Sequence, residues 1–212
     1  MKKLILFFAI VMVTTATFAQ VKVRPGFRAG LNASKITHIE NVNRKVGINA
    51  SMFVNVHLSR FYELQPELTY SNQGWTRDRF SYIDPYNDVT YNVNNEDVSS
   101  HYIGIALTNK FFVHPKIGLH VLLGPGMEFN VSDNLPYDSL TPIDLTLFGG
   151  IGYEFPFGLG LEARYKQGLI DVRDGYYDDY YYNNGYYEGS YYNGKNKLNS
   201  VFQFSVYYKF AW

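Results

Sequence analysis

Few residues in this 212-residue sequence are suited to catalysis or metal binding. The absence of cysteine excludes disulfides, thiolate metal sites and a cysteine nucleophile. The five histidines, His38, His57, His101, His114 and His120, show no HExxH or other recognised metal spacing. The sequence also lacks a nucleophile elbow and a phosphate-binding glycine loop. We therefore predict no catalytic residue, no metal site and no cofactor.

Glu63 and Glu67 come closest to a general acid–base pair, because residues four apart on a strand share one face. They could act in this way only if a substrate entered the space which that face lines. His57 and His120 alternate with apolar neighbours, and we interpret both as inward groups held by hydrogen bonds. His114 falls in a predicted turn and is expected to be solvated.

The elements that position these side chains are strands, because apolar residues recur at every second position. The clearest runs are Val46–Leu58, Tyr62–Ser71, Ile117–Asn130 and Phe202–Trp212. Weaker alternation covers residues 27–33, 103–111, 143–155 and 159–169. Each run approaches the roughly 9–11 residues that a tilted strand needs to cross a bilayer.

The connections between these eight segments alternate in length. Short turns at 58–61, 113–116 and 155–158 alternate with long polar stretches at 35–45, 74–97, 132–141 and 171–197. Short turns on one side and long loops on the other are typical of outer-membrane barrels. We predict an all-β fold, an eight-stranded antiparallel up-and-down transmembrane β-barrel with periplasmic termini and extracellular long loops.

The first residues have the pattern of an export signal. Lys2 and Lys3 precede an apolar run from Leu4 to Val13, and Thr17-Phe18-Ala19 suits a signal peptidase. The apolar run is shorter than the roughly 20 residues that a membrane-spanning helix requires. We expect residues 1–19 to be a cleaved signal peptide and residues 20–212 to form the barrel domain, in the outer membrane of a Gram-negative bacterium.

Charge distribution decides which strand face meets lipid. The polar face carries a mixture of acids and bases that we expect to form a structural network in the lumen: Arg28, Glu63, Glu67, Lys110, Glu128, Asp144, Glu154, Glu162, Arg164, Lys166 and Lys209. The opposite face is apolar, with aromatic residues near strand ends, as expected at lipid headgroups. The alternative, a water-soluble lipocalin-like barrel, would have an apolar cavity and a charged exterior. A formal net charge of zero argues against a nucleic-acid partner.

An ordered set of motifs resembles the PorT-like family of small outer-membrane proteins. The motifs are PGFRAGLNAS, YELQPELTYSNQGW, HYIGIALTNKFF, HVLLGPGMEFN, FGGIGYEF, GLEARYKQGLIDV and FQFSVYYKF. The resemblance implies an outer-membrane location and no established catalytic residues. Some members of that family are associated with protein secretion and surface attachment, whereas many have no assigned role.

A tyrosine repeat departs from that family pattern. Tyrosine pairs recur with a period of five: Tyr176 and Tyr177, Tyr181 and Tyr182, Tyr186 and Tyr187, Tyr191 and Tyr192. Asn184-Gly185 between them favours a hairpin turn. The pairs could simply stiffen this hairpin, or they could form a binding surface, because tyrosine offers rigid amphipathic contact area. A calcium site among the neighbouring acids is a further alternative, although the spacing matches no recognised calcium loop.

These observations lead to a functional hypothesis and two alternatives. We expect a non-enzymatic outer-membrane barrel that serves as a surface interaction or assembly component through residues 74–97 and 171–197. Its expected partners are outer-membrane lipid, the barrel-assembly machinery during biogenesis, and a protein or glycan at the extracellular loops. The alternatives are a small solute channel and a lipid-directed outer-membrane enzyme.

Overall fold

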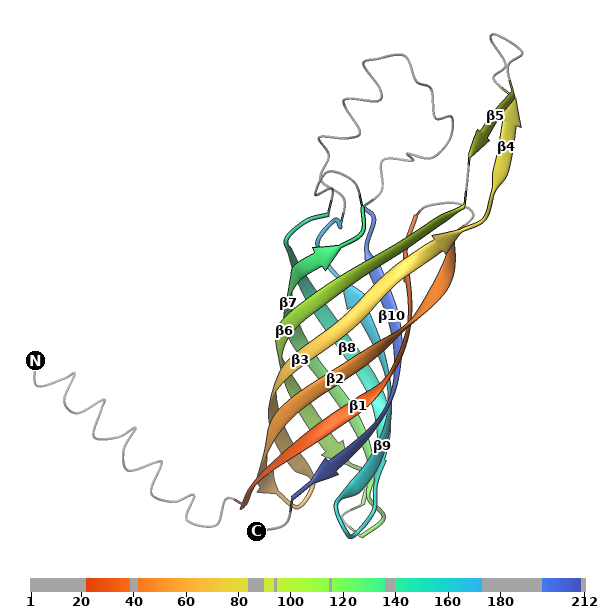
Figure 1. Ribbon diagram of the computed structural model, residues 1–212. Coiled ribbons are helices and arrows are strands. Elements are labelled where there is room, and N and C mark those ends of the chain that lie inside the picture. The colour runs from red at the N-terminus through yellow and green to blue at the C-terminus, as the bar shows by residue number, and fades with distance from the viewer. Residues whose placement is uncertain are drawn as a thin grey trace, which may run out of the picture.

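The computed structural model is a closed antiparallel barrel with a two-stranded arm beyond one end (Figure 1). It describes residues 22–38, 42–83, 90–93, 95–114, 116–135, 140–172 and 196–210. The barrel strands are β1 (Lys22–Ile36), β2 (Val42–Ser59), β3 (Tyr62–Arg77), β6 (Glu96–Phe112), β7 (Leu119–Asp133), β8 (Ile143–Glu154), β9 (Leu159–Gly168) and β10 (Asn199–Lys209). The first strand closes the barrel by pairing with the last, from Gly26–Lys209 to Ile36–Asn199. The predicted eight-stranded up-and-down barrel is confirmed.

The prediction of a polar loop over residues 74–97 was wrong for most of its length. β3 continues to Arg77, β6 begins at Glu96, and between them β4 (Phe80–Ile83) and β5 (Thr90–Val93) form the arm. The strict alternation of apolar residues ends where the strands leave the apolar belt. Periodicity alone therefore could not detect strands that continue beyond it.

The arm and the β3–β6 pair form one ribbon. The pairing stops at Arg77–Glu96 and resumes at Phe80–Val93 without a change of register, so that Tyr62 faces Phe111 and Ile83 faces Thr90. Neighbouring segments hold the base of this ribbon, because Asn43 Nδ2 donates to Asp78 Oδ2 at 2.8 Å and Lys45 forms an ion pair with Asp97. The ribbon therefore projects from the barrel as a continuation of its wall.

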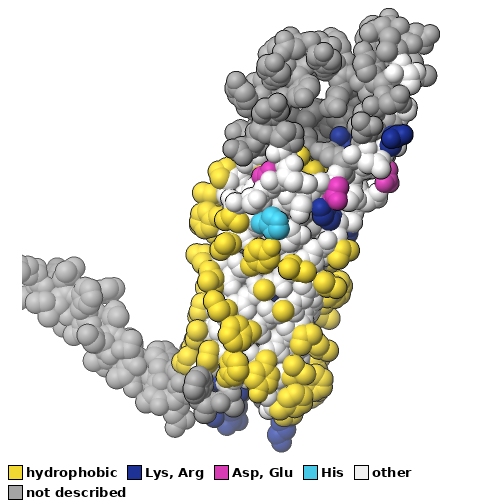
Figure 2. All heavy atoms as spheres, viewed as in Figure 1, with side chains coloured by type: hydrophobic (Ala, Val, Ile, Leu, Met, Phe, Trp, Pro, Cys, Tyr) yellow, Lys and Arg dark blue, Asp and Glu magenta, His cyan; other side chains and the backbone are white. Residues whose placement is uncertain are grey.

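Side chains alternate between a polar interior and an apolar exterior. Leu31, Ile48, Ile105 and Phe204 are each more than half exposed, and Figure 2 shows hydrophobic side chains over the sides of the barrel. Water-soluble proteins rarely expose apolar surface on this scale, whereas a bilayer solvates it. The lipocalin-like alternative is wrong, because the interior holds the charges and the exterior is apolar.

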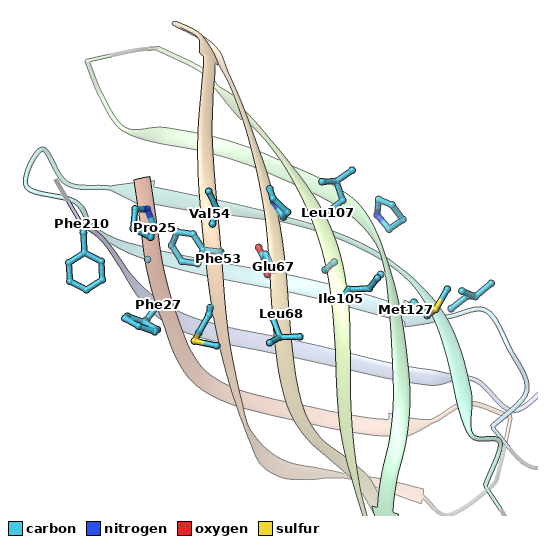
Figure 3. A pocket seen from close by; sticks show the side chains of 17 residues that line it. Pro25, Phe27, Phe53, Val54, Glu67, Leu68, Ile105, Leu107, Met127 and Phe210 are labelled. Atoms are coloured by element: carbon cyan, nitrogen blue, oxygen red, sulfur yellow. The ribbon is translucent and has the colours of Figure 1, made fainter. Parts of the chain in front are cut away.

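An apolar groove of about 1170 Å³ runs over the outer face of β1, β2, β3, β6, β7 and β8 (Figure 3). Two of its lining residues, Pro66 and Pro125, interrupt the strand ladders on either side of the β3–β6 pair. The β2–β3 pairing passes from Phe53–Glu67 directly to Val56–Leu64 around Pro66, which has no N–H to donate. At the Pro125 gap, Asn109 Nδ2 donates across to the Leu123 carbonyl oxygen at 3.2 Å.

Glycines on the inner face make room for aromatic side chains in the narrow lumen. A Cβ at Gly160 would lie 2.1 Å from the Tyr207 ring, and one at Gly26 would lie 2.4 Å from the Phe53 ring. A Cβ at Gly152 would similarly meet the imidazole of His120 at 2.4 Å. Each ring belongs to the residue paired with the glycine on the neighbouring strand, so the absence of a Cβ lets the ring lie over the glycine backbone and fill the lumen.

Replacing Gly160 with alanine is expected to destabilise the barrel by about 1–3 kcal/mol, the usual range for overpacking a core. The Tyr207 ring is 2% exposed and its hydroxyl is bonded to Glu154, so it has little room to move. Gly149→Ala is the matched control, because a Cβ there meets only the Leu122 carbonyl oxygen, at 3.8 Å. The urea midpoint of unfolding is measured for both variants in detergent micelles, with gel mobility without boiling as the readout of the folded barrel. Equal midpoints for the two variants would contradict this view of lumen packing.

Candidate functional site: the charged lumen

The eleven residues predicted to form a lumen network all line the interior of the barrel: Asp144 is buried, and the other ten form ion pairs with one another. Nine of these ten ion-paired residues are buried, and the side chain of the tenth, Glu154, is 14% exposed. They are Arg28, Glu63, Glu67, Lys110, Glu128, Glu154, Glu162, Arg164, Lys166 and Lys209. The structure gathers them into three layers along the barrel axis, which we name the central, turn-side and loop-side layers.

The central layer is built on Glu67. Arg28 donates two hydrogen bonds to this carboxylate, at 3.0 and 2.6 Å, and Arg164 adds another at 3.0 Å. Thr108 Oγ1 and Gln65 Nε2 also donate to it, at 2.6 and 2.8 Å. Its side chain is fully buried, and these donors come from β1, β3, β6 and β9. The carboxylate therefore links strands on opposite sides of the lumen.

Glu162 is the second acid of the central layer. Arg164 Nη2 lies 2.6 Å from its Oε2, and Lys110 Nζ lies 2.6 Å from its Oε1. The ammonium group of Lys110 also lies 4.1 Å from the centroid of the Tyr207 ring, a cation–π distance. The neighbouring His120 donates from Nδ1 to the Gly118 carbonyl oxygen at 3.0 Å, as expected for an inward histidine held by a hydrogen bond.

The turn-side layer lies toward the short connections. Lys209 Nζ is 3.0 Å from Glu63 and 2.6 Å from Glu154, so one cation joins two acids. His57 Nδ1 lies 3.0 Å from the other oxygen of Glu63, and the Tyr207 hydroxyl donates to Glu154 at 2.8 Å.

The loop-side layer contains the ion pair between Lys166 and Glu128, at 2.5 Å. Gln73 Nε2 donates to the second oxygen of Glu128 at 2.9 Å. Nearby, Asn199 Nδ2 donates to Asp144 at 3.0 Å. Neutral donors therefore supplement Lys166 in binding the carboxylates of this layer.

The layers leave little free space. A cavity lined by Arg28, Glu67 and Arg164 has a volume of about 20 Å³, which is room for about one water molecule. Beyond the loop-side layer, five buried residues form an apolar lid: Ile36, Trp75, Val98, Leu140 and Val172. Polar side chains therefore pack the middle of the lumen, and apolar ones close its loop end.

This arrangement does not form an acid–base pair. Glu63 and Glu67 belong to different layers, and each is saturated by its own cations. Among the residues that the structure describes, no group of three or more histidine or acidic side chains is placed to hold a metal ion. Exposed His114 accepts a hydrogen bond from the Lys116 amide at 3.2 Å within its turn. The lumen charges are thus arranged to fill and stiffen the barrel.

The structure reveals one part of the site that the sequence did not predict, the apolar lid, and does not describe another that it did predict, the tyrosine repeat. Trp75 and its lid partners were not predicted, because a single tryptophan in a presumed loop carries no periodic signal. The tyrosine repeat, Tyr176, Tyr177, Tyr181, Tyr182, Tyr186, Tyr187, Tyr191 and Tyr192, lies outside the described residues.

Comparison with known proteins agrees with this geometry. Residues 18–174 match the family model described as outer membrane protein beta-barrel domain. The chain belongs to this family. It is thus an outer-membrane barrel, and its apolar exterior is the surface that meets lipid. No helix in the described part of the chain is long and apolar enough to cross a membrane.

Solved structures with a similar fold include two outer-membrane barrels. Neisserial surface protein A is 16% identical, with 89% of this chain and 97% of that chain covered and a TM-score of 0.49. Ail, the attachment invasion locus protein of Yersinia pestis, is 10% identical, with 89% and 99% covered and a TM-score of 0.47. No curated protein sequence matches the chain.

Glu67→Gln is expected to cost the outer-membrane barrel about 3–5 kcal/mol of stability, because it removes one of the two buried carboxylates that Arg28 and Arg164 share and leaves Glu162 alone to pair with both. Asp97→Asn is the matched control. The Asp97 side chain is 69% exposed, and removing such a surface ion pair should change stability by about 1 kcal/mol or less. Urea unfolding in micelles compares the two. A loss for Glu67→Gln no larger than that for Asp97→Asn would show that the central layer does not hold the barrel together.

Proposed function

We propose that this protein is a non-enzymatic outer-membrane scaffold of the PorT-like kind, which presents a surface for interaction or assembly at the loop end of its barrel. The observation that carries the proposal is the ribbon, in which β4 and β5 continue the β3–β6 pair beyond the rim of the barrel without a change of register. In this proposal the short turns and both termini face the periplasm, and the ribbon faces the cell exterior.

The packed lumen supports a scaffold more than a channel. Within the central layer and within the turn-side layer, side chains form ion pairs of 2.6–3.0 Å, and the apolar lid covers the loop end. A solute would have to break several buried ion pairs to pass, and each broken pair leaves a charge without its partner.

The anchored ribbon supports recognition by a preorganised surface. The side chain of Asn134 makes two hydrogen bonds to the base of the ribbon. Its Nδ2 donates to the Asp97 carbonyl oxygen at 2.8 Å, and its Oδ1 accepts from the Ser99 backbone N–H at 2.8 Å. The start of the β7–β8 connection therefore holds the ribbon base. A rigid element loses less conformational entropy on binding than a flexible loop does. The tyrosine repeat, Tyr176–Tyr192, would enlarge this surface at the same end of the barrel.

Truncating the ribbon tests the proposal. Arg77 and Glu96 are paired in the register, so residues 78–95 can be replaced by Asn-Gly, the preferred two-residue hairpin turn. The variant should still migrate as a closed barrel in unboiled gels, because the β3–β6 ladder of the barrel ends at the Arg77–Glu96 pair, which is retained. Pull-downs from native outer membranes, analysed by mass spectrometry, should then lose partners that the intact protein retains.

A second bait without residues 176–195 separates the tyrosine repeat from the ribbon. Partners lost from this bait alone would assign recognition to the repeat, and partners lost from both would assign it to a joint surface. If all three folded baits retain the same set of proteins, recognition at the loop end is excluded.

A further inference from the structure

A basic vestibule opens at the turn end of the lumen, at the end of the barrel opposite the β4–β5 arm. It has a volume of about 500 Å³, and its walls come from the start of β1, the end of β2 and the three short turns. Four cationic side chains line it: Lys22, Arg24, Arg60 and Lys116. Figure 2 shows lysine and arginine side chains at this end of the barrel.

These four cations differ from the cations of the lumen layers. Each lumen cation lies within 3.0 Å of a carboxylate, whereas among the described residues Lys22, Arg24, Arg60 and Lys116 have no ion pair or side-chain hydrogen bond. The acids that also line the vestibule, Glu63 and Glu154, are already bound by Lys209. The four vestibule cations and Lys209 together outnumber the two acids by three, so the vestibule carries a net positive charge.

The walls of the vestibule are partly apolar. Phe112, Phe155 and Pro156 line it beside the cations, and Phe155 stacks on Phe157 with a centroid distance of 5.5 Å. The side chain of Phe112 faces inward, and its ring lies 5.0 Å from that of His120. A small inorganic anion would use the charges of this cavity but would leave the rings without a partner.

The direction of the opening favours a water-borne ligand over a lipid headgroup. Arg24, His57 and Glu154 occupy inward positions of their strands, so the vestibule continues the lumen along the barrel axis. A lipid in the bilayer would approach from the side, where the outward positions are apolar. Charge, aromatic walls and axial access together fit an acidic polypeptide segment that also carries an apolar side chain.

We propose that this vestibule binds an acidic peptide segment of a partner protein located on the turn side of the membrane. With the orientation given in the proposed function, that partner is periplasmic. The binding itself does not depend on the orientation, and it adds a second contact surface at the end of the barrel opposite the ribbon.

Binding can be measured by fluorescence anisotropy with the folded protein in a neutral detergent. The probe is a capped, dye-labelled peptide of alternating glutamate and phenylalanine, and its lysine–phenylalanine counterpart controls for binding to micelles. The acidic probe should bind, and its affinity should fall as the salt concentration rises, because salt screens exposed charges. The basic probe should not bind in a salt-dependent way.

A matched pair of double variants locates the site. Arg60→Gln/Lys116→Gln removes two vestibule cations, and Lys35→Gln/Arg79→Gln removes one lysine and one arginine at the loop end. Removing two exposed charge contacts should lower the affinity roughly fivefold to tenfold. We expect this loss for the vestibule variant and an unchanged affinity for the loop-end variant. Adding Lys22→Gln and Arg24→Gln to the first variant should abolish binding. Gel mobility without boiling verifies that each variant is folded.

Several results would overturn the proposal. They are the absence of salt-dependent binding, equal losses for the two double variants, and binding of pyrophosphate or anionic-lipid nanodiscs without binding of the acidic peptide. None of these results bears on the ribbon, whose test uses the opposite end of the molecule.

Discussion

The structure depends on one constraint, that no peptide group facing lipid can remain unpaired without a large cost. Pairing of β1 with β10 meets this constraint by closing the sheet. Closure with eight strands then sets the width of the lumen, which side chains must fill. Glycines at positions such as Gly160 and Gly152 allow the largest rings to fit, and the ion pairs occupy the remainder.

The lumen shows how a barrel can bury charge without an apolar core. Glu67 is fully buried, yet four side chains donate to it, so its charge is compensated within its own layer. The pairs connect strands that are not neighbours in the sheet, such as Arg28 of β1 with Glu67 of β3. In the same way, Arg164 of β9 reaches Glu67 across the lumen. The network thus acts as a cross-brace in addition to the strand ladders, and it leaves the two ends of the barrel to meet other molecules.

Sequence alone predicted the parts of the fold that depend on local pattern. Alternation from Val46 to Leu58 and from Phe202 to Trp212 identified strands, and the connection lengths identified the barrel. The pairing of particular charges could not be predicted, because it depends on which strands face each other across the lumen. The β4–β5 arm was missed because its strands are short and lack a clear two-residue alternation. The lid residue Trp75 was missed because the apolar alternation of its strand ends before it. The vestibule was missed because its cations are scattered over β1 and two turns and converge only after closure.

The most direct test of the central claim is single-channel recording of the purified protein in planar bilayers. With a lumen packed by ion pairs and covered by the apolar lid, the folded barrel should insert without producing discrete conductance steps. Insertion can be verified independently by protease protection of the reconstituted protein. Stable, ion-conducting steps from protein shown to be folded and inserted would contradict the closed lumen, and the scaffold proposed from it would give way to a channel.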